Sequence, residues 1–416
     1  MFQIDLRSRK SVYDQIVDNF KQLIKGEVLK AGESIPTIQD LSKTLVANPN
    51  TVLRAYFELE SQGFLETEEG KDWFVAGANK CEESSGINAL YGRLHADVKA
   101  LIESGETRAA IGNILGMDEK MYIQADGLGK RFDQVVALDG LNMNVGKGSI
   151  YGLVGTNGSG KTTILKHLAG LYYPESGTIK INGISTYNNE HGLNVAYISE
   201  EMYFLPDYTL KMLQKFMSSK HKATWNKERY AQLVELFGLN EDQVLSTFSR
   251  GMQKQAGFIV ALATMPDVLL LDETIDAMDP IVRRQSFKYI VEDVIDREMT
   301  VVVTSHNISE LDGICDTVGM LKDGKMVQER SLDDLRANVH KIHIAFPENF
   351  LLTNYPYDAL EVLHMEEYGS TDVLVVRGKA DEISKHLQSF NPLVYDHLPM
   401  TLEEIFIYER SVVRHD

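Results

Sequence analysis

The sequence has few cysteines and no long apolar run. Only two of its 416 residues are cysteine, Cys81 and Cys315, and their wide separation excludes a disulfide framework and favours a reducing compartment. No stretch contains the roughly 18 consecutive apolar residues of a membrane-spanning helix. The N-terminal residues also lack the apolar core of a signal peptide. We therefore expect a cytoplasmic protein that does not cross a membrane by itself.

Positive charge is also in deficit. The 42 Lys and Arg residues stand against 60 Asp and Glu residues, for a formal net charge of −18. This balance argues against a nucleic-acid-binding or membrane-surface-binding face that extends over the whole chain. Since domains usually contain roughly 100–200 residues, the length predicts two or three of them.

Apolar spacing and polar stretches divide the sequence into four segments. Residues 1–76 predict a mainly helical unit that ends in a hairpin. Residues 77–120 predict a connection with two helices, which we expect to pack on the first segment or to mediate dimerisation. Residues 121–336 alternate strand-like and helical runs, which is typical of an α/β domain with a largely parallel sheet. Residues 337–416 predict a small α+β domain.

Helix-start signals are clear in the first segment. Thr37 can cap a short helix because Asp40 follows three residues later. Asn48-Pro49 is a strong helix start, an N-cap followed by proline at the first helical position. Gly63 should end that helix, and two short strands are expected after it.

A phosphate-binding loop is the strongest chemical signal. It follows the apolar strand Ile150–Val154, precedes a helical run and matches the pattern G-x-x-x-x-G-K-[ST]. Glycines let backbone N–H groups converge on a phosphate, and the helix N-terminus adds partial positive charge. Lysine and threonine of the pattern reach phosphate oxygens and Mg²⁺. We expect ATP to be bound by Gly155, Thr156, Asn157, Gly158, Ser159, Gly160, Lys161, Thr162 and Thr163.

Two carboxylates end a second apolar strand, Val268–Leu271. Asp272 has the position of an aspartate that holds Mg²⁺ together with Thr162. Glu273 would act as the general base that polarises the attacking water. Further apolar strand-like runs at Val195–Ile198 and Thr300–Thr304 complete the expected sheet.

The order of these and further motifs over residues 121–336 resembles the nucleotide-binding domain of ABC transporters. The resemblance implies that Phe132 stacks on adenine and that His306 is the switch histidine that contacts the γ-phosphate. Glu200 replaces the usual glutamine near Mg²⁺, where a carboxylate can still approach the ion or its water shell. Tyr208-Thr209-Leu210 resembles the segment that meets a membrane permease.

A signature motif and a D-loop extend this resemblance. In such proteins both elements meet the ATP that is bound by the opposite subunit, so the resemblance implies a head-to-tail dimer with two ATP molecules between the chains. A homodimer is the simplest solution, and pairing with a sister ATPase is the alternative. Arg250 and Met252 depart from the commonest signature, and Thr274-Ile275 replaces the usual Pro-Thr. The residues expected to act in trans are Ser249, Arg250, Gly251, Met252, Gln253 and Asp279.

Residues 1–76 resemble the winged-helix domain of the GntR family of bacterial repressors. The resemblance is carried by Gly32-Glu33-Ser34-Ile35-Pro36, by the run from Asn48 to Tyr56 and by Gly63-Phe64-Leu65. The two helices expected in 77–120 also resemble the extension of the YtrA-like branch. A recognition helix at 49–61 is implied. The residues expected to face the major groove and phosphates are Asn50, Thr51, Arg54 and Tyr56.

The charge of this segment leaves its role open. Nine basic and twelve acidic residues give residues 1–76 a net charge of −3, whereas DNA affinity depends on neutralised phosphates. Gln39 and Glu68-Glu69 stand where the family usually has basic residues. One hypothesis is a dimerisation or regulatory module, and the other is an operator-binding domain that couples the ATP state to transcription.

The leading interpretation is the ATPase subunit of a bacterial ABC transporter, an exporter, attached to the inner face of the membrane through a separate permease. The segment Thr401–Phe406 resembles the C-terminal end of export-type ATPases. The alternative is an ATP-responsive GntR-type transcriptional regulator without a permease. A translation-associated ABC protein is a third possibility, but such proteins usually carry two cassettes, and this sequence has one.

Overall fold

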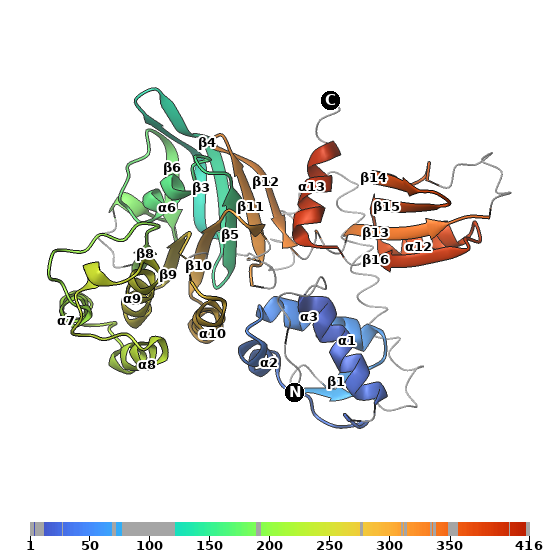
Figure 1. The fold of residues 1–416 in the computed structure, drawn as a ribbon, viewed down its shortest axis with the longest axis horizontal. Coiled ribbons are helices and arrows are strands. Elements are labelled where there is room, and N and C mark those ends of the chain that lie inside the picture. Colours follow the sequence, from blue (N-terminus) through green and yellow to red (C-terminus); the bar gives the residue numbers. More distant parts are fainter. Residues whose placement is uncertain are drawn as a thin grey trace.

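The computed structural model describes three folded units of the chain (Figure 1). The described residues are 4, 12–26, 28–68, 72–76, 121–188, 193–274, 278–308, 311, 314–332, 335, 338–347, 357–398 and 400–412. The helices expected in 77–120 lie outside these residues. In the part of the chain that is described, no helix has both the length and the apolar character needed to span a bilayer.

The first unit is helical and ends in an antiparallel hairpin, as predicted. Its elements are α1 (Val12–Lys25), α2 (Ile38–Leu45), α3 (Pro49–Ser61), β1 (Leu65–Glu68) and β2 (Asp72–Val75).

Local signals explain where the helices of this unit begin. The Thr37 hydroxyl accepts the Asp40 N–H, which confirms the expected cap of α2.

The core of the first unit holds an aromatic group in which Tyr56 meets Phe20 and Trp73 edge to face, with ring centroids 5.5 and 5.3 Å apart. This core is separate from the apolar clusters of the other units.

The second unit contains the predicted parallel sheet. The strands lie in the order β12-β11-β5-β10-β9-β8, all neighbours being parallel except β11 and β12. Their bounds are β5 (Ile150–Gly155), β8 (Val195–Ile198), β9 (Val268–Asp272), β10 (Thr300–Ser305), β11 (Thr317–Lys322) and β12 (Lys325–Ser331). All five residues of β9 are buried, as expected of a central strand between two layers.

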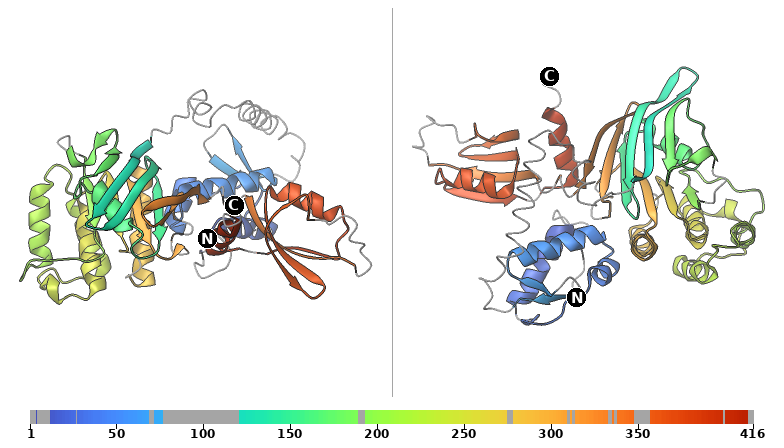
Figure 2. Two further views of the ribbon diagram at one scale, coloured as in Figure 1. Left: turned by 90° about the horizontal axis from the view of Figure 1, so that it is seen from above. Right: turned by 180° about the vertical axis from the view of Figure 1, so that it is seen from behind.

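Helices and a second sheet cover this central sheet (Figures 1 and 2). The helices are α6 (Lys161–Leu168), α7 (Leu210–Lys220), α8 (Lys227–Phe237), α9 (Arg250–Ala263) and α10 (Pro280–Arg297). The second sheet is antiparallel, in the order β4-β3-β6-β7, and the sequence patterns did not predict it. It comprises β3 (Met121–Phe132), β4 (Val135–Gly146), β6 (Ser176–Ile181) and β7 (Ile184–Ser185).

The third unit is α+β, as expected. An antiparallel sheet in the order β14-β15-β13-β16 carries α12 on one face and α13 on the other. The elements are β13 (Val339–Ala345), β14 (Glu361–Tyr368), β15 (Thr371–Arg377), α12 (Ala380–Gln388), β16 (Val394–Leu398) and α13 (Leu402–Val412). Leu402, Ile405 and Phe406 of α13 join the large apolar cluster of the second unit, so these two units share a core.

The first unit contacts the second through α2, which lies beside α10 (Figures 1 and 2). The Lys43 ammonium is 2.7 Å from the Asp296 carboxylate, across 253 residues of sequence. The helical first unit is therefore docked on the α/β unit.

Candidate functional site

The predicted phosphate loop connects β5 to α6. Gly160 stands at the N-cap of α6 with φ of 109°, a conformation that favours glycine. A Cβ atom at this position would lie 2.6 Å from the Ala137 carbonyl oxygen, so the loop also needs glycine for space. Thr156, Asn157 and Gly158 are exposed, whereas Ser159 is buried. The loop therefore presents its outer backbone to solvent at a helix N-terminus, where an anion is stabilised.

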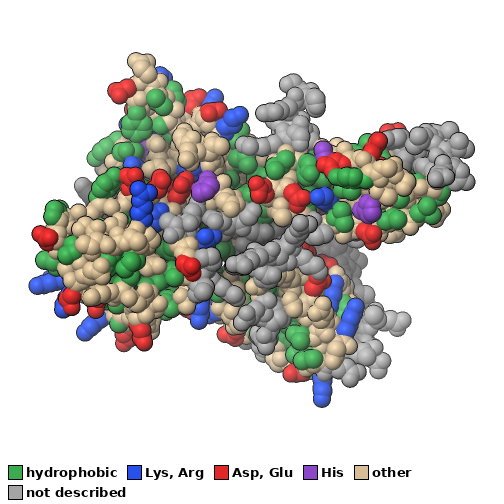
Figure 3. Space-filling view, in the orientation of Figure 1, with side chains coloured by type: hydrophobic (Ala, Val, Ile, Leu, Met, Phe, Trp, Pro, Cys, Tyr) green, Lys and Arg blue, Asp and Glu red, His purple; other side chains and the backbone are tan. Residues whose placement is uncertain are grey.

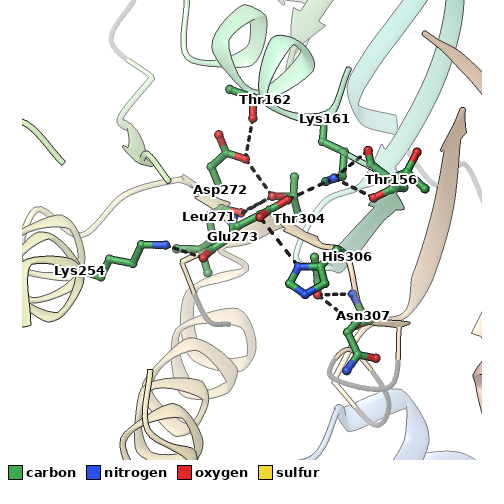
Figure 4. A network of polar contacts seen from close by, with 12 residues as sticks. Thr156, Lys161, Thr162, Lys254, Leu271, Asp272, Glu273, Thr304, His306 and Asn307 are labelled. Carbon is green, nitrogen blue, oxygen red and sulfur yellow. Dashed lines mark hydrogen bonds and ion pairs between the residues drawn. The ribbon is translucent and has the colours of Figure 1, made fainter. Parts of the chain in front are cut away.

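Lys161 lies under this loop and is only 5% exposed. Its ammonium donates to the carbonyl oxygens of Gly155 and Thr156, at 2.8 and 3.4 Å. It also lies 3.2 Å from Oε1 of Glu273 (Figure 4). The lysine thus links the phosphate loop to the end of β9, 112 positions further along the sequence, as the order of the motifs led us to expect.

Asp272 is completely buried at the end of β9. Its Oδ1 accepts the hydroxyls of Thr162 and Thr304, at 3.2 and 3.0 Å, and its Oδ2 accepts the Tyr197 hydroxyl at 3.0 Å. The three hydroxyls orient both carboxylate oxygens of Asp272 beside Thr162. The oxygen-rich donor set of Asp272 and Thr162 fits a hard divalent cation such as Mg²⁺.

Glu273 adopts an unusual backbone conformation immediately after the strand. Its φ is 43°, in the left-handed region that costs free energy for residues other than glycine. Two contacts hold it there: its N–H donates to the Thr304 hydroxyl at 2.9 Å, and its carbonyl oxygen accepts the Lys254 ammonium at 2.6 Å. The carboxylate is directed towards Lys161 and towards His306, whose Nδ1 is 3.9 Å from Oε2 (Figure 4).

The sequence motifs missed three residues that hold the two carboxylates. Thr304 lies directly beside Asp272 in the parallel register of β10 and β9. Tyr197 comes from β8 on the other side of β9, and its pKa is raised by burial and by the neighbouring Asp272 charge. Lys254 is in the first turns of α9 and only 6% exposed. A charged residue inside the apolar face of a helix was the available signal for Lys254.

The signature segment opens α9, as expected of an anion-facing helix end. The Ser249 side chain caps the helix by accepting the Met252 N–H at 3.3 Å. Arg250 and Gln253 line a cavity that also reaches Glu200 and Glu273. Gly251 lies in the first turn of the same helix.

Glu200 and Asp279 are exposed, and the structure places Glu200 at the cavity rather than on Asp272. Asp276 and Ala277 of the expected D-loop lie outside the described residues.

Phe132 lies at the end of β3 and is 40% exposed. Its ring meets Tyr172 edge to face, with centroids 5.4 Å apart, and the Lys130 ammonium lies over it at 5.5 Å. Tyr172 follows α6 closely in sequence. An exposed aromatic surface therefore lies near the helix that begins at the phosphate loop, which suits stacking of a flat base.

Two of the four residues expected to face DNA are buried. Tyr56 is fully buried and donates its hydroxyl to the Pro36 carbonyl at 2.9 Å, and Thr51 is 4% exposed. The prediction that these two side chains face the major groove is therefore wrong, because Tyr56 belongs to the apolar core of the unit and Thr51 is buried. The side chains of Asn50 and Arg54 lie outside the described part.

Known protein families match both the first and the second unit of the chain. Residues 138–276 match the family model described as "ABC transporter", and residues 12–75 match "Bacterial regulatory proteins, gntR family". The first unit is therefore a GntR-type winged-helix domain, and the second is an ABC-type ATP-binding domain, here called the ATPase domain.

Relatives extend the match beyond the family models. The chain is 27% identical over 289 residues to the "ABC transporter ATP-binding protein YtrB" of Bacillus subtilis (strain 168), covering 68% of this chain and 97% of that protein. It is 31% identical over 223 residues to the "Bacitracin transport ATP-binding protein BcrA" of Bacillus licheniformis, covering 53% of this chain and 72% of that protein. A solved "Structure of ATP binding subunit of ABC transporter" has 23% identity, covers 52% of this chain and 92% of that one, and gives a TM-score of 0.47. The chain belongs to the family of ABC transporter ATP-binding proteins, which are ATPases coupled to transport.

Proposed function

We propose that this chain binds and hydrolyses Mg·ATP as one subunit of a bacterial ABC exporter and drives a separately encoded membrane permease. The observation that carries the proposal is the convergence of Lys161, Asp272, Glu273 and His306 at one loop, with Glu273 held by its backbone. The roles below belong to this proposal.

Lys161 would bind the β- and γ-phosphate oxygens. Thr162 and Asp272 would hold Mg²⁺, which when bound neutralises charge on those oxygens. Because Lys161 is 3.2 Å from Glu273, a phosphate that takes the ammonium also releases the carboxylate. Glu273 then accepts a proton from the attacking water, and His306 stabilises the γ-phosphate from the other side.

The proposed working state is a head-to-tail dimer. Ser249 and Arg250 at the start of α9 are exposed, so this helix end is available to the phosphates of an ATP that another chain holds. Asp279 is likewise exposed. Two identical chains satisfy this geometry most simply, and the signature residues of one would complete the site of the other.

An apolar patch supports docking on a permease. Tyr203, Leu205, Met212 and Phe216 are 85, 66, 51 and 56% exposed. Met212 and Phe216 are one turn apart on α7 and therefore share a face. Figure 3 shows apolar side chains among charged ones on the side that α7 and α8 occupy. Exposed apolar side chains of this size are typical of interaction surfaces.

Export is the direction that we propose for the transport. The support for it is the segment that leads into α13, Thr401–Phe406, where the sequence resembles export-type ATPases. The chain itself would then remain in the cytoplasm, peripheral to the membrane through its permease.

The test of the ATPase roles is Glu273→Gln. This variant should bind ATP but turn it over at least about a hundredfold more slowly, because the general base is lost while the phosphate contacts remain. Single-turnover hydrolysis and nucleotide binding are measured in parallel, with Glu235→Gln on the exposed face of α8 as the matched control. Turnover near that of the control would refute Glu273 as the base.

A second candidate function is favoured by the match of residues 12–75 to the gntR family, namely an ATP-responsive DNA-binding regulator. DNA binding by this acidic domain should show a steep dependence on salt. A gel-shift titration with the chain's own promoter tests it, and absence of a shift at about 50 mM salt would sink this function.

A further inference from the structure

The winged-helix domain contacts the ATPase domain through one compact surface, here called the α2–α3 corner. It consists of Lys43 at the end of α2, Val46 in the turn, and Asn48 before α3. Lys43 and Asn48 have partners in the ATPase domain, and Val46 packs on the apolar cluster that this domain shares with the third unit. The three contacts differ in kind, being an ion pair, an apolar contact and a buried hydrogen bond.

Asn48 makes the most specific contact. It is 2% exposed, and its Nδ2 donates to the carbonyl oxygen of Ile314 at 2.9 Å. Ile314 lies on the connection between β10 and β11 that begins with His306, eight residues earlier. The winged helix is therefore bonded to the connection that carries the switch histidine, here called the switch segment and defined by the described residues 306–308, 311 and 314–316.

Val46 makes its contact from a backbone conformation that is unfavourable for valine. It adopts φ 54° and ψ 52°, a left-handed conformation that is rare for a β-branched residue. Its side chain packs against the large apolar cluster that the ATPase domain shares with the third unit. A turn that needed only its local geometry would favour glycine or asparagine here. The apolar contact made by its side chain explains why valine stands here in place of glycine or asparagine.

Lys43 adds charge complementarity at the rim. Its ammonium pairs with Asp296 of α10 at 2.7 Å, and the neighbouring Asp296, Glu292 and Asp40 carboxylates raise its pKa. Both side chains are partly exposed, so this pair contributes orientation more than stability.

The corner also includes the end of the helix-turn-helix that usually approaches DNA. In such domains the N-terminal residues of the recognition helix reach the base edges. Here the residue that precedes α3 is buried on the switch segment. The net charge of −3 over residues 1–76 disfavours a polyanion such as DNA as the partner of this domain.

We propose that the α2–α3 corner is a docking surface for the chain's own ATPase domain, and that ATP binding beside His306 loosens it. The proposal rests on the proposed ATPase function. His306 is 60% exposed and 3.9 Å from Glu273, so a γ-phosphate between them would draw the switch segment towards the nucleotide. Movement of that segment displaces the Ile314 carbonyl from Asn48. By linkage, the docked winged helix then weakens ATP binding to the same degree that ATP weakens docking.

Val46→Asp separates the role of this residue in the turn from its role in the apolar contact. Aspartate tolerates the left-handed turn better than valine, so the winged helix itself should remain folded. Its carboxylate would face the apolar cluster and oppose docking. Val28→Asp is the matched control, because Val28 is 66% exposed and lies in the same domain. Lys43→Glu breaks the ion pair with Asp296, and the double variant Lys43→Glu/Asp296→Lys restores it with the charges exchanged.

Docking is measured by energy transfer in the full chain. Dyes on Gln62→Cys and Val327→Cys, in a Cys81→Ser background, report the distance between the two domains, and labelled chains are diluted into unlabelled ones so that only transfer within one chain counts. Cys315 is buried and should remain unlabelled. ATP binding is measured in the Glu273→Gln background, and turnover is measured in the parent chain.

The expected result is high transfer without nucleotide, a fall with Mg·ATP, and low transfer in Val46→Asp at all ATP concentrations. Val46→Asp should also bind ATP at least about fivefold more tightly, while Val28→Asp behaves as the parent. Lys43→Glu should lower transfer, and the swap should restore it.

Three outcomes overturn the proposal. High transfer in Val46→Asp would show that this corner does not hold the domains together. If ATP leaves the energy transfer unchanged in a chain that hydrolyses ATP, the proposed effect of ATP on docking is refuted, and the ATPase function is not. Promoter DNA that lowers transfer without ATP would assign the corner to DNA. A parent chain without turnover would refute the proposed function instead.

Discussion

At the scale of single residues, the site depends on hydroxyl and ammonium groups that orient two carboxylates. Asp272 is held by three hydroxyls from three different elements, and Glu273 is held through its backbone by Thr304 and Lys254. The motifs name the two carboxylates and Thr162, but not Tyr197, Thr304 and Lys254, which also orient those carboxylates. Those groups should therefore affect metal use and turnover without contacting ATP.

Tyr197→Phe tests the support of Asp272. Loss of the hydroxyl removes one hydrogen bond to a buried charge, which is worth about 1.5–3 kcal/mol. We expect the Mg²⁺ concentration for half-maximal ATPase activity to rise about tenfold, with little change at saturating Mg²⁺. Tyr187→Phe, at an exposed tyrosine, is the control. An unchanged Mg²⁺ dependence would contradict a positioning role for Tyr197.

Lys254→Met tests the support of Glu273. Methionine fills similar space but cannot donate to the Glu273 carbonyl, so the strained residue loses one of its two backbone contacts. We expect kcat to fall about tenfold while the affinity for ATP stays within about twofold. Lys254→Arg should recover part of the rate, since arginine keeps a donor. Equal losses in kcat and ATP affinity would indicate a general structural defect.

At the scale of elements, the phosphate loop combines a glycine conformation with a close approach of backbone. Gly160→Ala adds both a left-handed penalty and a clash at 2.6 Å with Ala137. Gly183→Ala is the matched control, because Gly183 has φ of 77° but open space around its Cβ position. We expect ATP affinity to fall at least about tenfold only in Gly160→Ala. Both variants should lose about 1 kcal/mol or more of stability, and Gly160→Ala should lose the more because of its clash. Equal ATP affinity in Gly160→Ala and Gly183→Ala would show that the loop relieves the clash with Ala137 without losing ATP binding.

At the scale of the whole molecule, the exposed patch on α7 should separate transport from hydrolysis. Phe216→Asp places a charge on the surface proposed for the permease. We expect co-purification with a permease encoded beside this chain to be lost while basal ATPase activity is retained. Leu393→Asp, at a side chain 70% exposed in the third unit, is the control. Retained co-purification in Phe216→Asp would place the permease contact elsewhere.

Much of this architecture could be predicted because its signals are local. Thr37 and Asp40 predicted a cap, and the apolar runs predicted β5, β8, β9 and β10 within one or two residues. The antiparallel sheet of β3, β4, β6 and β7 was missed because its long strands are interrupted by register shifts and lack a clean alternation. The spacing of Val52, Ala55, Tyr56 and Leu59 places Tyr56 on one helix face, but the resemblance assigned Tyr56 and Thr51 to the groove, and both are buried.

The sequence alone determined the chemistry of this protein. Spacing within a few residues predicts the phosphate loop, the paired carboxylates and the helix caps, since each depends on neighbours along the chain. Only the tertiary structure decided what lies beside them. The register of parallel strands brings Thr304 and Tyr197 to Asp272, and α9 brings Lys254 to Glu273. The contact of Asn48 with Ile314 spans 266 positions, a distance over which no local pattern carries information.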